Sequence, residues 1–420
     1  MPWKETCVLN EKTKFIARLL DGEKMSRLCN EYGISRKTGY KIWNRYQNVG
    51  HYALVDRART PHRFANQLPE QIERTILKLK CEKPHFGAPK IRELIVRKFP
   101  DLRHPAISTI HAVLDRNGFV KHRKQRRYRA EGTQLSKGLN PNDLWCTDFK
   151  GEFMLGDRRY CYPLTITDRA SRYLFAVEAL DSVKEKGVFP VFERVFQKYG
   201  IPKAIRSDNG VPFASPNGLF GLSKLSVWWL RLGIQIERIK PGHPEQNGQH
   251  ERMHLELKKA TAQPAGKNFL EQQEKFESFN FEYNHERPHQ ALNMKFPSEL
   301  YQRSVQCYQG IGRIDYPMHH KVITVTSCGR ICYKGLKISF SNVFSGQNVG
   351  IRQVEDKTWL VSFMDYDLGY FDELSGQFEP GPNPFGPKLQ SESLISGRLS
   401  LPEGSELDAK TKPANNHDGR

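Results

Sequence analysis

The chain has 420 residues, enough for two to four domains with separate hydrophobic cores. It carries 65 Lys and Arg residues against 46 Asp and Glu residues, and the first 138 positions hold 30 of the basic but only 13 of the acidic ones. This local positive charge is typical of a surface that neutralises a phosphate backbone, and it disfavours a membrane partner. No run of about 18 apolar residues predicts a membrane span, and the first residues lack the apolar core of a signal peptide. We therefore expect a cytoplasmic protein.

The eight cysteines do not form a recognisable zinc or redox motif. No CxxC pair occurs, and Cys328 with Cys332 is not followed by a histidine pair at zinc-finger spacing. Reduced and mostly buried thiols are the prediction.

The chain begins with a pattern of short amphipathic helices, and we assign residues 1–56 to a helix-turn-helix domain. Gly33 stands where a tight turn is needed, and Ser35 is a suitable N-cap for the third helix. In a helix-turn-helix motif the second helix of the motif reads the major groove of DNA. The alternative is a helical domain whose basic face contacts no DNA. The predicted DNA-binding residues on this helix are Arg36, Lys37, Tyr40, Lys41 and Asn44.

A second helical pattern covers residues 69–120 and predicts a second helix-turn-helix domain, joined to the first by a linker at 57–68. A strongly basic linker follows at 121–138. Such a run is often only a solvated arm, but here we favour an arm that lies along a nucleic-acid backbone or in the minor groove. The predicted DNA-binding residues of this basic arm are Lys121, Arg123, Lys124, Arg126, Arg127 and Arg129.

From residue 139 the pattern changes to short strands. Three strands, then helix, strand, helix, strand and helix predict a mixed sheet flanked by helices over residues 139–302. Closely spaced short strands over 315–378 predict a small β-barrel, and the Pro-, Gly- and Ser-rich residues 379–420 are predicted to be disordered. The expected fold is therefore multidomain: all-α units, a central α/β core and a C-terminal β-barrel.

Three acidic residues stand in distinctive motifs: Asp148 in LWCTDFKGEF, Asp208 in AIRSDNG and Glu251 in PGHPEQNGQHERMH. Asp148 falls in the first strand, and Asp208 ends a later strand, where open α/β sheets place ligand sites. Three carboxylates brought together repel one another unless cations intervene, and hard oxygen ligands favour Mg²⁺ or Mn²⁺. Two ions about 4 Å apart support an in-line displacement at phosphorus. We predict that all three acids are catalytic and bind two Mg²⁺ ions, for which Mn²⁺ could substitute, with Asp148 bridging both.

Taken singly, each acid also has a structural interpretation: an aspartate of an edge strand, a turn former, or a surface acid of a helix. The helix that contains Glu251 is expected to carry His254, Leu255 and Lys258 on the same face as Glu251. Its other face would pack on the sheet through Met253, Leu257 and Ala260.

The motifs WCTDFKG, IRSDNGVPF, KPGHPEQNGQHERMH and NHERPHQAL resemble those of the DDE transposases of bacterial insertion sequences, within the retroviral integrase-like superfamily. The resemblance runs from the first helical domain to the predicted SH3-like barrel. It implies an RNase H-like core, two metal ions, and cutting of element ends followed by strand transfer through a 3′-hydroxyl. It also selects Glu251 rather than Glu245, places Asn247 and Gly248 in a mobile loop, and implies that Lys258 and Lys259 contact the DNA end. A solvated helix face is the alternative for these two lysines.

Two features depart from the retroviral pattern: the amino-terminal His and Cys zinc module is missing, and the interval from Asp208 to Glu251 is longer. The expected function is that of a transposase or integrase, associated with the nucleoid. It would bind the terminal repeats of a mobile element in double-stranded DNA and cleave and join strands as a homo-oligomer, without a membrane partner. A DNA-binding regulator derived from a transposase and a metal-dependent nuclease without joining activity are the alternatives.

Overall fold

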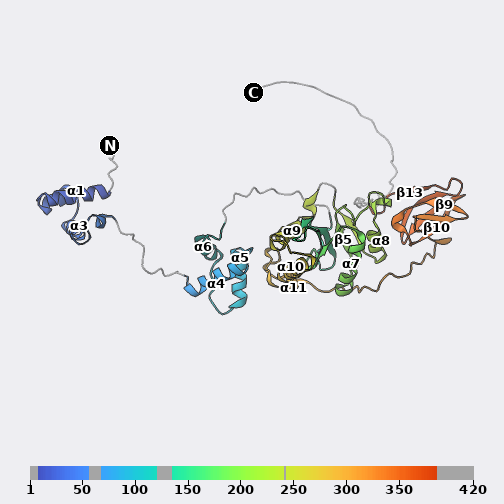
Figure 1. Ribbon diagram of the computed structural model, residues 1–420, viewed down its shortest axis with the longest axis horizontal. Coiled ribbons are helices and arrows are strands. Elements are labelled where there is room, and N and C mark those ends of the chain that lie inside the picture. The colour runs from blue at the N-terminus through green and yellow to red at the C-terminus, as the bar shows by residue number, and fades with distance from the viewer. Residues whose placement is uncertain (1–7, 56–67, 121–134, 241–242, 386–420) are drawn as a thin grey trace, which may run out of the picture. The chain divides into compact units, whose positions relative to one another are not determined.

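The computed structural model describes residues 8–55, 68–120, 135–240 and 243–385 (Figure 1). The chain divides into one unit of residues 1–75 and another of residues 76–420. No helix in the described parts of either unit is long and apolar enough to cross a membrane.

The first unit contains the predicted helices: α1 (Val8–Leu20), α2 (Met25–Glu31), α3 (Arg36–Val49) and a 3-10 turn (His51–Leu54). Phe15 and Leu28 are fully buried between them. The turn before α3 has the expected chemistry, because Gly33 has a φ of +65° and the Ser35 hydroxyl accepts a hydrogen bond from the Thr38 N–H at 3.2 Å. The five residues predicted to bind DNA from α3 are all exposed, namely Arg36, Lys37, Tyr40, Lys41 and Asn44.

The second helical pattern is also confirmed as helix: α4 (Glu70–Glu82), α5 (Ala88–Lys98) and α6 (Ile107–Arg116). Their apolar stripes are buried at Ile76, Ile91 and Ile110. The arm residues Lys121, Arg123, Lys124, Arg126, Arg127 and Arg129 lie outside the described residues, as does most of the linker at 57–68.

Six strands in the described part of the central region form one mixed sheet: β1 (Leu144–Phe149), β2 (Phe153–Met154), β3 (Tyr160–Asp168), β4 (Leu174–Leu180), β5 (Ala204–Ser207) and β6 (Gln235–Arg238). The order is β2-β3-β1-β5-β6, with β4 also paired to β3. β1 pairs antiparallel with β3 and parallel with β5, and β5 pairs parallel with β6. The mixed sheet that the sequence predicted is therefore confirmed.

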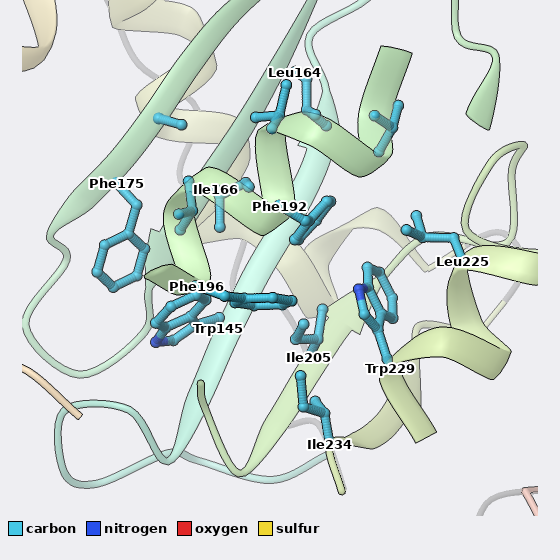
Figure 2. Close-up of a cluster of buried hydrophobic side chains, with 14 of the residues drawn as sticks. Trp145, Leu164, Ile166, Phe175, Phe192, Phe196, Ile205, Leu225, Trp229 and Ile234 are labelled. Atoms are coloured by element: carbon cyan, nitrogen blue, oxygen red, sulfur yellow. The ribbon is translucent and has the colours of Figure 1, made fainter. Parts of the chain in front are cut away.

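Helices cover both faces of this sheet: α7 (Glu185–Tyr199), α8 (Lys224–Arg231), α9 (Gly248–Thr261), α10 (Phe269–Phe281) and the short α11 (Pro297–Leu300). Figure 2 shows the core on the α7 and α8 side, where Trp145 of β1 packs with Phe192, Phe196 and Trp229. Burying one such Phe side chain stabilises the fold by roughly 1.5–3 kcal/mol.

The opposite face of the sheet packs against α9 and α10. Met253, Leu257 and Phe276 bury there against Leu174 of β4. Successive residues of a strand point to opposite faces, so β3 directs Leu164 and Ile166 toward α7 while Thr165 and Thr167 face α9. This alternation places two hydroxyl groups under the helix that carries Glu251.

The predicted C-terminal β-barrel over 315–378 is wrong. The strands are β7 (Lys321–Thr324), β8 (Arg330–Tyr333), β9 (Leu336–Ser339), β10 (Asn348–Glu355), β11 (Thr358–Phe363), β12 (Tyr366–Asp372) and β13 (Phe378–Pro380). Within these residues, β13-β12-β11-β10-β7 form an open antiparallel sheet, and β8 with β9 forms a separate hairpin, so no sheet closes.

The hairpin and the larger sheet are held together by side-chain packing and not by backbone hydrogen bonds between paired strands. Ile331 and Ile338 of the hairpin bury against Val349 and Val361 of the larger sheet. The backbone between β7 and β8 instead bonds locally, because the Thr326 N–H donates to the Arg330 carbonyl at 2.9 Å. Two packed layers and a closed barrel both bury every second side chain of a strand. An alternating pattern of apolar residues therefore does not distinguish the two architectures.

Candidate active site

Asp148 and Asp208 lie at the same edge of the sheet. β1 and β5 are parallel neighbours, and Cys146 of β1 lies opposite Arg206 of β5. Asp148 and Asp208 each come two residues later, so they follow in the same register. Asp148 is the next-to-last residue of β1, and Asp208 directly follows β5. The carboxyl ends of these parallel strands therefore bring the two predicted residues side by side.

The turn after β5 fixes the Asp208 carboxylate. Its Oδ1 accepts a hydrogen bond from the Gly210 N–H at 3.1 Å, and the Asn209 side chain donates to the Ile239 carbonyl at 2.7 Å. A Cβ atom at position 210 would lie 2.9 Å from Asp208 Oδ2, so glycine permits this close turn. Asp208 therefore does form a turn, which was the alternative role that its sequence motif allowed. The hydrogen bond within this turn also orients its carboxylate.

Glu251 lies in the first turn of α9 and is exposed. Burial, followed by the charges of Asp208 and, more weakly, Glu251, raises the pKa of the Asp148 carboxyl to about 7. Burial also raises the pKa of Asp208, against the opposing hydrogen bond from Gly210. Asp208 and Glu251 therefore each lie near enough to Asp148 for their charges to raise its pKa.

These residues supply the donor chemistry for a hard divalent cation, since all three are carboxylates and the charges of two of them raise the pKa of Asp148. As the side chains lie, no group of three or more His, Cys, Asp or Glu residues in the described ranges is positioned to hold a metal ion.

We predict a characteristic pH dependence for the protein without divalent cations. The Asp148 carboxyl has its pKa raised from 3.8 to about 7 in the folded protein, so between these values the folded state holds a proton that the unfolded chain has lost. The free energy of unfolding should therefore fall as pH rises through this window. Thermal unfolding in EDTA, measured across the window, would show the effect.

The matched control for this titration is Asp148→Asn, which should flatten the pH profile. Added Mg²⁺ should stabilise the wild type most at the alkaline end, where no proton competes for the carboxylate. An identical pH profile for wild type and Asp148→Asn would contradict this assignment.

Two histidines of α9 join the helix to the sheet beside Asp148. The Thr165 hydroxyl lies 2.6 Å from His250 Nε2 and 2.7 Å from His254 Nε2, and it donates to the Asp148 carbonyl at 2.9 Å. His254 Nδ1 lies 3.8 Å from Asp148 Oδ2. Burial lowers the pKa of His250 to about 3 and the pKa of His254 far below its usual range, so both imidazoles are neutral.

The sequence assigned two positions of α9 to the wrong face. His254 was expected on the same face as Glu251 but is buried, and Ala260 was expected to pack on the sheet but is exposed. The buried stripe recurs every three or four residues from His250, and both His250 and His254 lie on it. Met253 and Leu257 are buried as predicted. The predicted DNA-contacting residues Lys258 and Lys259 are exposed in the last turn.

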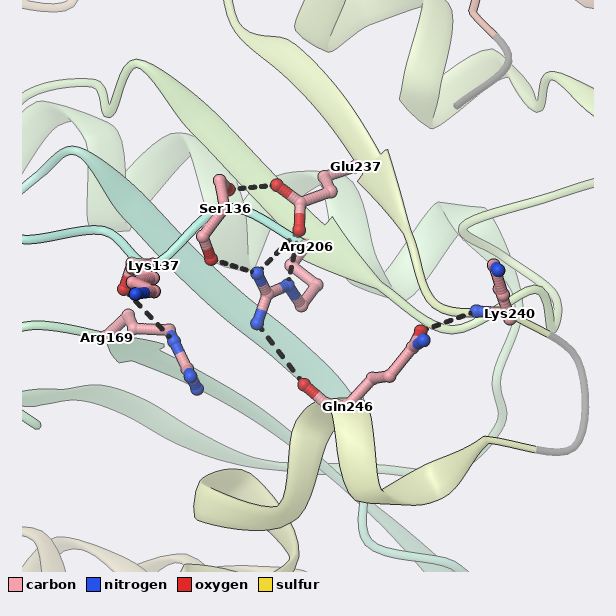
Figure 3. Close-up of polar contacts among 7 residues, drawn as sticks. All are labelled: Ser136, Lys137, Arg169, Arg206, Glu237, Lys240 and Gln246. Atoms are coloured by element: carbon pink, nitrogen blue, oxygen red, sulfur yellow. Dashed lines mark hydrogen bonds and ion pairs between the residues drawn. The ribbon is translucent and has the colours of Figure 1, made fainter. Parts of the chain in front are cut away.

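Arg206 is a second feature that the sequence did not reveal. Its guanidinium is fully buried and binds Glu237 Oε1 through Nε at 2.8 Å and Nη2 at 2.5 Å. It also donates to the Ser136 carbonyl at 2.5 Å and to the Gln246 carbonyl at 3.2 Å (Figure 3). The Gln246 side chain in turn accepts from the Lys240 N–H at 2.8 Å. The available signal was an arginine inside a short apolar strand, which requires a buried acceptor.

The Arg206 contacts connect three chain segments: β6, the residues that lead into β1, and the 3-10 turn Pro244–Asn247 directly before α9. Arg206 stands two residues before Asp208, and the turn stands directly before the helix of Glu251. One buried cation thus links the strand of one candidate acid to the helix of another.

Family models describe both parts of the chain. Integrase core domain models match residues 139–244 and 232–297, a helix-turn-helix domain model matches residues 11–62, and a homeodomain-like domain model matches residues 38–114. The chain belongs to the transposases of the integrase-like superfamily. Integrase-like domains generally use divalent metal ions, and the donor chemistry of the transposase fits this.

Two curated relatives come from insertion elements. The transposase is 25% identical over 285 residues to the 31.7 kDa protein of insertion element IS407 from Burkholderia multivorans, covering 66% of this chain and 94% of that one. It is 28% identical over 163 residues to the 39.2 kDa protein of insertion element IS476 from Xanthomonas euvesicatoria, covering 39% and 44%.

A solved structure with a similar core is the HTLV-2 integrase catalytic core domain in complex with magnesium. It is 15% identical to the transposase, covers 39% of this chain and 99% of its own, and has a TM-score of 0.32.

Proposed function

We propose that the transposase binds the terminal repeats of its mobile element in double-stranded DNA and that its core cleaves and joins DNA strands with two divalent metal ions. The observation that carries this proposal is the parallel register of β1 and β5, which brings Asp148 and Asp208 to one edge of the sheet, near enough to Glu251 for its charge to act on Asp148. Carboxylates gathered in this way suit charge stabilisation at phosphorus when divalent cations are bound.

Asp148, Asp208 and Glu251 would hold two Mg²⁺ ions, with Mn²⁺ as a substitute. When bound, the metal would activate the attacking oxygen and stabilise the leaving oxygen at phosphorus. The chain itself would position the three carboxylates. The sheet fixes Asp148, the Gly210 N–H orients Asp208, and Arg206 holds the turn before Glu251. The exposed Lys258 and Lys259 would contact the DNA end.

DNA recognition would come from the helical units. The exposed face of α3 would read bases, while the basic arm at 121–138 would track phosphates, so affinity should fall steeply with salt. Because two element ends must be joined, the transposase would act as a homo-oligomer on DNA, in the cytoplasm at the nucleoid.

An end-processing assay tests the proposal. Purified full-length protein is incubated with labelled duplexes that carry the element ends, and with target DNA, in Mg²⁺ or in EDTA. We expect cleaved ends and joined products in Mg²⁺ and neither in EDTA. Cleavage without joined products would indicate the nuclease alternative. Retention of the duplex without cleavage would indicate the regulator.

A further inference from the structure

The hydrogen bonds of Thr165 determine where two histidines carry their protons. A threonine hydroxyl has one hydrogen to donate and two lone pairs. Thr165 donates its hydrogen to the Asp148 carbonyl at 2.9 Å, which only accepts. Both histidine Nε2 atoms, at 2.6 and 2.7 Å, must therefore donate to the hydroxyl oxygen. Each imidazole is then protonated at Nε2 and has a lone pair at Nδ1.

The two Nδ1 atoms differ in what they face. His250 Nδ1 lies 3.0 Å from the Thr167 hydroxyl, which can donate to it in place of the longer contact with the Cys146 carbonyl at 3.4 Å. His254 Nδ1 faces Asp148 Oδ2 at 3.8 Å, and a carboxylate oxygen offers another lone pair. No hydrogen bond to this nitrogen comes from the described residues, and the nitrogen keeps a small contact with solvent. When Asp148 is ionised, its Oδ2 lone pair and the Nδ1 lone pair face each other across a gap that one divalent cation can bridge.

We infer that His254 Nδ1 is a nitrogen ligand of the divalent cation held by Asp148, an inference that rests on the proposed function. The separation of 3.8 Å is shorter than two metal–ligand bonds of about 2.1 Å each, so one cation can contact both atoms. Thr165 holds the imidazole in the required tautomer and also anchors the Asp148 backbone, as outer partners of metal-binding histidines do.

The test uses Mn²⁺ alone as the probe, bound to the full chain without DNA. Pulsed electron paramagnetic resonance detects nitrogen nuclei coupled to bound Mn²⁺, and calorimetry gives its affinity. We expect histidine nitrogen coupling in the wild type. In His254→Gln the coupling should disappear and Mn²⁺ binding should weaken about tenfold, because the glutamine amide can still reach Thr165 but leaves no donor atom beside Asp148.

His250→Gln is the matched control, since it makes the same change one helical turn earlier in the same hydrogen-bond network. It should keep the nitrogen coupling, whereas Asp148→Asn should lose it. Labelling the histidines of the wild type with ¹⁵N should convert the signal to that of ¹⁵N, which tests histidine ligation even if a variant unfolds.

The outcomes separate this inference from the proposed function. Mn²⁺ binding that depends on Asp148 but shows no histidine nitrogen coupling would refute ligation by His254 and leave the two-metal function in place. A coupling that survives in His254→Gln but not in His250→Gln would also refute it. Absence of any Mn²⁺ binding that depends on Asp148 would overturn both.

Discussion

Replacing Asp208 by asparagine should reduce DNA cleavage and joining by on the order of 10³-fold or more, while retention of the element-end duplex persists. The substitution is isosteric, and the asparagine oxygen can still accept the hydrogen bond that the Gly210 N–H donates to Asp208 Oδ1. The turn after β5 should therefore keep its shape. What is lost is one negative charge at the edge where Asp148 and Asp208 interact. Gel assays of labelled ends would measure products and retention together.

The control for this prediction is Asp157→Asn. Asp157 is an exposed carboxylate in the turn between β2 and β3, paired with Arg159 at 2.8 Å, so the variant makes the same chemical change away from the candidate site. It should cleave and join like the wild type. Equal activity of Asp208→Asn and wild type would remove Asp208 from the catalytic set.

The fold was largely predictable in the segments where apolar residues recur with a clear helical or strand spacing. Alternation and strand order predicted the mixed sheet, and the N-cap Ser35 and turn residue Gly33 predicted the start of α3. The C-terminal barrel was not predictable in this way, because the alternating residues of β8 and β9 are buried equally well by a packed hairpin. Whether strand edges join depends on backbone hydrogen bonds far apart in the sequence.

The acids of the site were predictable from their motifs, but their supporting residues were not. Asp208 and Glu251 stand beside small turn residues that mark their positions. His254 and Arg206 are polar side chains inside apolar stripes, and their partners Thr165 and Glu237 lie 89 and 31 residues away in the chain. A sequence pattern shows that such a residue needs a partner, but it does not identify that partner.

Replacing Arg206 by methionine should lower the free energy of unfolding by about 3–5 kcal/mol, because Glu237 would keep its charge in a mostly buried position without a partner. The Ser136 and Gln246 carbonyls would lose their donor at the same time. Chemical denaturation of the full chain would measure the loss. An unchanged free energy of unfolding would show that solvent replaces the guanidinium at little cost.

The double variant Arg206→Met with Glu237→Leu separates stability from positioning. It leaves no unpaired buried charge, so most of the lost stability should return. Cleavage should stay low, because the Gln246 carbonyl still lacks a donor and the turn before α9 is no longer held to β5. Cleavage measured at a temperature where both variants are folded decides the matter. If the double variant regains stability and cleavage together, Arg206 acts on the site only through the fold; if it regains stability alone, Arg206 sets the position of the helix that carries Glu251.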